Sequence, residues 1–132
     1  MALTRHNQTA VTHDKDSVHL ETYARGIELF NKRKFFDAHE VLEDVWRAAP
    51  AEQKRFLQGL IQLAVALHHH STGNNVGALS LLKRAAANLA AEPRQDRGIC
   101  VPDLLLAIHE CAGAIEKGVP LPSLPILHQP EC

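Results

Sequence analysis

The chain has 132 residues, of which 45% are hydrophobic and 22% charged, and its formal net charge at neutral pH is −1. This length and composition are those of one globular domain with its own core, and they exclude a disordered chain. The near-zero charge and the aromatic content of 5% argue against nucleic acid or an anionic membrane as a partner.

The N-terminal half of the sequence predicts three helices. Residues 1–16 are polar and are expected to be flexible, and Ser17 then suits the N-cap of a first helix that ends near residue 31. A second, amphipathic helix is expected over about 34–48. Pro50 favours the start of a third helix over about 51–70, which is apolar nearly all round from Leu57 onward and is therefore expected to be central.

Two further helices are expected before a tail that is rich in proline. The fourth helix, over about 75–90, has a stripe of small and aliphatic residues, Ala78, Leu82, Ala85 and Leu89. Pro102 opens a fifth helix that runs to about Lys117, with Gly118 as its stop. Residues 119–132 contain four prolines and cannot be helical throughout.

These segments predict an all-α protein. No stretch alternates as a β-strand does, and short connections favour antiparallel neighbours. The expected fold is a single-domain antiparallel helical bundle of about five helices over residues 17–118, with an extended Pro-rich C-terminal tail, residues 119–132, packed on the bundle.

The cellular location is predicted from the N-terminus, the longest apolar stretch and the cysteines. The N-terminus lacks the apolar run of a signal peptide, and the longest apolar stretch, residues 57–67, is too short to span a bilayer. Three cysteines, Cys100, Cys111 and Cys132, show no CxxC spacing, so free thiols in a reducing compartment are expected. The sequence therefore predicts a cytoplasmic protein without a membrane span.

The candidate site is a pair of ionisable residues on the apolar face of the second helix. His39 and Glu43 lie one turn apart between Phe35, Phe36 and Trp46. Burying such groups costs several kcal/mol, roughly, unless they pair, form hydrogen bonds or hold a metal ion. We therefore expect His39 and Glu43 to point inward and to form a site.

The third helix offers polar partners for this pair. Gln58, Gln62 and His69 share one face of that helix. If the two helices are antiparallel, Glu43 comes level with the region of Gln58, and His39 with the region of Gln62. The glutamines and Trp46 are then expected to line a polar site between the helices.

Three interpretations of this site remain open at the level of sequence. The first is a divalent metal ion, zinc or iron, held by His39 and Glu43, with a third donor from His69, from another histidine or from a water held by Gln58 or Gln62. The second is a structural hydrogen-bond network of the pair with the glutamines. The third is a small-ligand or catalytic pocket in which Glu43 orients His39 for proton transfer. The spacing is not the HExxH of zinc proteases, and no nucleophile elbow or phosphate loop accompanies it.

Several segments of the chain resemble a known family. They are residues 25–31, residues 35–46 with the pattern HxxxExxW at His39, Glu43 and Trp46, residues 56–69, and Gly73-Asn74 with Gly77-Ala78. Over roughly residues 20–90 the chain resembles the domain of unknown function 309 family of bacteria and archaea. The resemblance implies a small all-helical fold and the same His–Glu pair, for which metal binding has been suggested, but no named reaction.

Two functional hypotheses follow. The first is a cytoplasmic protein of unknown function with a polar site between helices at His39 and Glu43 that binds a metal ion. The alternative is a helical scaffold for protein interaction or homodimer formation, in which this pair is purely structural and the apolar tail is a dimer contact. Neither hypothesis decides whether the protein is an enzyme.

Overall fold

The computed structural model describes residues 19–91, 98–123 and 125–127. These residues form five helices and no strand, so the all-α prediction is confirmed. The helices are a first helix that includes residues 19–31, α2 (Phe35–Ala48), α3 (Ala51–Ser71), α4 (Asn75–Ala90) and α5 (Val101–Lys117). The predicted flexible segment, residues 1–16, and the predicted cap Ser17 lie outside the described residues.

The helix ends follow local chemistry. The side chain of Asn74 accepts a hydrogen bond from the Gly77 N–H at 3.0 Å and so caps the start of α4. Gly118 has φ 70° and closes α5 in the left-handed conformation, which glycine adopts without a steric penalty. These signals explain why the predicted boundaries of α3, α4 and α5 agree with the structure to within one residue.

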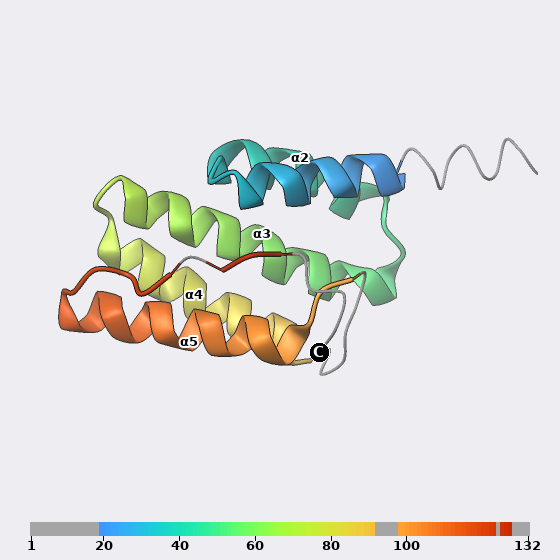
Figure 1. Ribbon diagram of the computed structural model, residues 1–132. Helices are drawn as coiled ribbons and strands as arrows, with labels where there is room; N and C mark the ends of the chain where they lie inside the picture. Colours follow the sequence, from blue (N-terminus) through green and yellow to red (C-terminus); the bar gives the residue numbers. More distant parts are fainter. Residues whose placement is uncertain (1–18, 92–97, 124, 128–132) are drawn as a thin grey trace, which may run out of the picture.

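The helices pack in an antiparallel array in which α3 is central. In Figure 1, α3 lies between α2 on one side and α4 on the other, and α5 packs on α4. The first helix approaches α2 closely, since a Cβ added at Gly26 would lie 2.8 Å from a methyl carbon of Leu42. One core runs through all these layers, and its largest fully buried side chains include Phe30, Leu42, Phe56, Leu60, Leu63, Leu67, Leu82, Leu89 and Ile108.

The described part of the Pro-rich segment lies along the bundle (Figure 1). Leu127 is buried in the core, and its backbone N–H donates to Oδ1 of Asn31 at 2.8 Å. Leu121 also packs against the core. These residues therefore contact the bundle, whereas positions 124 and 128–132 lie outside the described residues, and the predicted division into bundle and tail stays a prediction.

The cysteines differ from the expectation of three free thiols. Cys111 is free and buried, but Cys100 is disulfide-bonded, so the expectation is wrong there. The sequence alone does not show which cysteines come within bonding distance in the folded chain, so this bond was not predicted. In the described ranges, no helix has both the length and the hydropathy that a membrane span requires.

Candidate functional site

Four residues of α2 form a stripe that lies along the edge of α3. Phe36, His39, Glu43 and Trp46, here called the α2 stripe, recur at helical spacing. At one end, the Phe36 ring lies 5.2 Å from the ring of His68 of α3, and at the other, Nζ of Lys54 lies 4.3 Å from the centre of the Trp46 ring. These two contacts fix α2 and α3 as antiparallel, with the His–Glu pair between them.

One ring nitrogen of His39 is held by its own helix. Nδ1 lies 2.6 Å from the carbonyl oxygen of Phe36, and the His39 ring packs edge-on against the Phe36 ring at 4.8 Å. Because a carbonyl oxygen only accepts hydrogen bonds, Nδ1 carries the proton and donates it. The side chain is 16% exposed, and Nε2 remains as the nitrogen that can accept a hydrogen bond or bind an ion.

The carboxylate of Glu43 lies on the Nε2 side of this ring. Its Oε1 atom is 4.0 Å from Nε2 of His39 and 3.8 Å from Nη2 of Arg47. Arg47 makes its shorter contact elsewhere, 2.7 Å from Nη1 to Oδ1 of Asp44. Since the Glu43 side chain is 43% exposed, the pair borders solvent instead of lying deep in the core.

The two predicted glutamine partners do not bond to this pair. Gln58 is exposed, and Oε1 of Gln62 accepts a hydrogen bond from Nδ2 of Asn88 in α4 at 2.7 Å. In the described part of the chain, no hydrogen bond joins either glutamine to His39 or Glu43. The interpretation of a hydrogen-bond network between the pair and these glutamines is therefore wrong, because the side of α3 that carries Gln62 faces α4.

His69 lies beyond the pair, at the end of α3. Its Nδ1 is 3.4 Å from Nδ2 of Asn74, in the turn that leads to α4. Within residues 19–91, 98–123 and 125–127, no three His, Cys, Asp or Glu side chains form a cluster that could hold a metal ion. The structure thus brings His39 and Glu43 together and does not add His69 as a third ligand.

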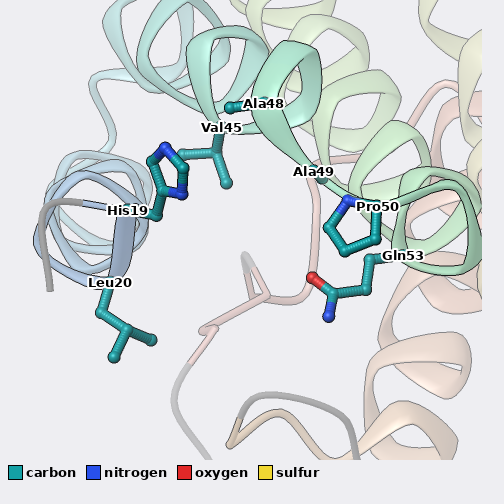
Figure 2. Close-up of a pocket in the computed structure, with 7 residues that line it drawn as sticks. All are labelled: His19, Leu20, Val45, Ala48, Ala49, Pro50 and Gln53. Atoms are coloured by element: carbon teal, nitrogen blue, oxygen red, sulfur yellow. The ribbon is translucent and has the colours of Figure 1, made fainter. Parts of the chain in front are cut away.

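Two buried polar atoms near this region were not found by sequence reasoning. Nε1 of Trp46 and Oε1 of Gln53 have no hydrogen-bond partner among the described residues. Gln53 lines a cavity of about 330 Å³ beside the α2–α3 turn, where its amide extends toward the side on which His19 and Val45 lie (Figure 2). No sequence pattern marks either atom, because buried tryptophan and glutamine side chains are usually hydrogen-bonded to neighbouring groups.

The class defined by these observations is a small all-α protein whose second helix carries a partly exposed His–Glu pair. Residues 23–81 match the family described as Domain of unknown function (DUF309). This segment contains the whole α2 stripe together with Gln58, Gln62 and His69. The predicted resemblance is therefore confirmed for the part of the chain that carries the pair.

Two bacterial relatives are similar to the same region. "Uncharacterized protein YpuF" of Bacillus subtilis (strain 168) is 41% identical over 76 residues, which are 55% of this chain and 44% of that protein. An "Uncharacterized protein" of Aquifex aeolicus (strain VF5) is 35% identical over 92 residues, which are 69% of this chain and 28% of that protein. The chain thus spans less than half the length of these relatives, and neither name states a reaction.

Proposed function

We propose that His39 and Glu43 form a binding site for a divalent metal ion, zinc or iron, on the α2 stripe. One observation carries this proposal. The Nδ1 of His39 is bound to the Phe36 carbonyl at 2.6 Å, and Nε2 is left facing the Glu43 carboxylate at 4.0 Å.

This arrangement fits the known chemistry of metal sites. A metal-bound histidine usually donates its second ring N–H to a carbonyl or carboxylate, which fixes the ring and its tautomer. Bonds from zinc to nitrogen or carboxylate oxygen are about 2.0–2.2 Å long, so Nε2 and Oε1, which are 4.0 Å apart, lie within reach of one ion. Imidazole with carboxylate suits zinc and iron alike.

The competing structural interpretation has less support. A network of this pair with the glutamines does not form, since Gln62 bonds to Asn88 and Gln58 is exposed. Because the Glu43 side chain is 43% exposed, its carboxylate stays in contact with water, and its ion pair with His39 contributes little to the stability of the fold. A pair that borders solvent and has one free ring nitrogen is better suited to binding than to fixing the packing of the helices.

The proposed ion would act as a Lewis acid when bound, while His39 and Glu43 hold it and leave coordination positions for other donors. No reaction is assigned to the site.

The proposal is tested by metal uptake of the purified, tag-free protein. The protein is stripped with a chelator and titrated with Zn²⁺, and in a separate anaerobic series with Fe²⁺, by isothermal calorimetry. His39→Ala and Glu43→Gln should each weaken binding at least ~10-fold, as expected when a ligand or its support is lost. The control His109→Ala, at an exposed position of α5, should bind as the unmodified protein does.

The outcome that contradicts the proposal is equally clear. If neither ion binds, or if both variants bind as the unmodified protein does, His39 and Glu43 are not metal ligands. Helical content by circular dichroism is measured for each variant, and Glu43→Gln, which preserves shape, guards against loss of the fold.

A further inference from the structure

We propose that the cavity beside the α2–α3 turn binds a small organic amine, whose ammonium group donates a hydrogen bond to Oε1 of Gln53 while its apolar part fills the cavity. This site does not depend on the proposed metal site, because neither His39 nor Glu43 lines the cavity. The volume of about 330 Å³ lies at the lower end of the range found for small-molecule sites.

The walls of the cavity are mostly apolar. Leu20 of the first helix, Val45 of α2 and Pro50 of the turn contribute hydrocarbon surface. In Figure 2, His19 and Leu20 lie on one side of the cavity, and Pro50 and Gln53 lie on the other. An apolar lining with a few polar groups is typical of sites that bind small organic molecules, so these walls suit the apolar part of the ligand.

The acceptor for the ammonium group is Oε1 of Gln53. This atom is buried and has no hydrogen-bond donor among the described residues. Figure 2 shows that the Gln53 amide extends from α3 toward the side on which His19 lies. A buried carbonyl oxygen without a donor destabilises the folded chain, so a ligand that supplies a donor is favoured here. The ring of His19 adds a second acceptor when it is neutral.

The end of α2 offers further acceptors to the same cavity. The last carbonyl groups of a helix have no partner within it, and here the Ala49 N–H bonds to the carbonyl of Trp46. Pro50, the next residue, has no N–H to donate to the others. Because the carboxyl end of a helix also carries partial negative charge, this end of the cavity favours a cation.

The start of α3 does not supply donors to the cavity. Its first two N–H groups belong to Ala51 and Glu52, and neither residue lines the cavity. The third, that of Gln53, donates to the carbonyl oxygen of Pro50 at 3.0 Å. Acceptors therefore prevail over donors in the lining, which favours an ammonium group over a carboxylate.

The cations nearest to this turn are bound elsewhere. Nη1 of Arg47 lies 2.7 Å from Oδ1 of Asp44, and Nζ of Lys54 lies 4.3 Å from the centre of the Trp46 ring. The described residues that line the cavity include no Lys, Arg, Asp or Glu. An ammonium ion in the cavity therefore does not meet a fixed lysine or arginine charge there.

Amine binding is tested by nuclear magnetic resonance on ¹⁵N-labelled, tag-free protein. The protein is titrated with benzylamine, an ammonium ion at neutral pH, and with benzyl alcohol and benzoate, which carry a neutral and an anionic group on the same ring. Benzylamine should bind saturably and shift the side-chain amide signals of Gln53. Benzyl alcohol should bind at least ~10-fold more weakly, because its hydrogen bond is not charge-assisted, and benzoate should not bind.

Variants show whether the probe occupies this cavity. Gln53→Leu removes the acceptor and should weaken benzylamine binding at least ~10-fold. Gln58→Leu makes the same change at an exposed position of α3 and should bind as the unmodified protein does. Ala48→Leu narrows the cavity from an exposed position and should also weaken binding. His39→Ala should bind benzylamine normally, which separates this site from the metal site.

The opposite results overturn the proposal. If benzyl alcohol or benzoate binds as tightly as benzylamine, the ligand is not selected as a cation, and if none of the three binds, the cavity is not an amine site. Unchanged binding in Gln53→Leu would refute the role of its amide. Helical content is measured for each variant, and if Gln53→Leu fails to fold, undiminished binding by Ala48→Leu would refute the site.

Discussion

The two faces of α3 differ in how far the polar side chains next to them are hydrogen-bonded. On the side toward α4, Arg55 donates from Nε to Oδ1 of Asn88 at 3.3 Å, and Nδ2 of Asn88 donates to Oε1 of Gln62 at 2.7 Å. On the side toward α2, Glu43 is half-exposed and Nε1 of Trp46 is buried without a partner. The polar side chains between α3 and α4 are hydrogen-bonded to one another, whereas the edge between α2 and α3 leaves Nε1 of Trp46 without a partner.

This comparison indicates how to separate structural from functional polar groups in a small bundle. A hydrogen-bonded chain of amides within a closed interface fixes the packing of two helices and has no free atom for a ligand. A pair with a fixed tautomer and a free nitrogen, next to solvent, has such an atom. The predictions that follow perturb one face at a time and ask whether stability or binding responds.

The largest loss of stability is expected when the close approach of α3 and α4 is disturbed. A Cβ at Gly59 would lie 2.7 Å from Cγ of Leu89, so Gly59→Ala should lower the free energy of unfolding by about 1–3 kcal/mol through overpacking. Leu89→Ala alone should cost about 2–5 kcal/mol. In the Leu89→Ala background only the Ala85 carbonyl oxygen, at 3.3 Å, stays close to the added methyl group, so Gly59→Ala should cost much less than in the unmodified protein.

Urea denaturation of the four proteins measures this coupling. Additive costs of the two substitutions would contradict the proposed contact between Gly59 and Leu89. Zinc affinity, measured in parallel under native conditions, should be unchanged in the variants that stay folded, because the α2 stripe does not touch this interface.

A smaller loss is expected when the amide chain between α3 and α4 is cut. Asn88→Ala leaves Oε1 of Gln62 without a donor and should destabilise the protein by about 1–2 kcal/mol. The double variant Asn88→Leu with Gln62→Leu should cost less than the sum of the single changes, since no orphaned polar atom remains. Thermal unfolding of all variants decides this, and strict additivity would argue that the hydrogen bond does not form.

Another prediction concerns Cys111, a buried residue of α5. Burial, and secondarily the charge of Glu110, raises the pKa of the Cys111 thiol above its ordinary value of 9.0. The thiol therefore stays protonated at neutral pH, and iodoacetamide should modify the folded protein far more slowly than the urea-unfolded chain. Rapid modification of folded protein at pH 7.5 would contradict this burial.

The raised pKa of Cys111 also has a consequence for stability. Its contribution is fully present below the unfolded value of about 9.0, where both states hold the proton, and is lost as pH rises through the higher pKa of the folded state. Replacement by Ser removes this thiol, so the decline in stability above pH 9 should be shallower in Cys111→Ser.

The smallest effect is expected at Arg47. Its contact with Glu43 spans 3.8 Å, and its side chain is mostly exposed, so Arg47→Ala should change the free energy of unfolding by less than about 0.5 kcal/mol. The substitution removes a cation that competes for the Glu43 carboxylate. Zinc affinity should therefore rise a few-fold, and a decrease in affinity would indicate that Arg47 supports the site.

Local sequence signals predict the helices well because they act within a few residues. Pro50, Asn74 and Gly118 mark helix boundaries through backbone geometry and capping, which need no knowledge of the rest of the fold. The pairing of His39 with Glu43 is likewise local, since both lie on one helix face one turn apart.

The partners of α3 could not be predicted in the same way. This helix is apolar nearly all round, so its sequence does not say whether the side with Gln62 faces α2 or α4. One signal was present, because a glycine at position 59 in an apolar helix marks a close approach by another helix, here by Leu89 of α4. The side of α3 that carries Gly59 and Gln62 therefore faces α4 and not α2, which explains why the glutamine network with His39 and Glu43 does not form.

The metal site is tested most directly by titrating zinc into the unmodified protein and into His39→Ala, with calorimetry as the readout and identical conditions for both proteins. A metal site at His39 predicts saturable binding by the unmodified protein, at least ~10-fold weaker binding by His39→Ala, and equal helical content in both proteins. Equal zinc affinity in the two proteins would contradict the claim that the free nitrogen of His39 makes the α2 stripe a metal site.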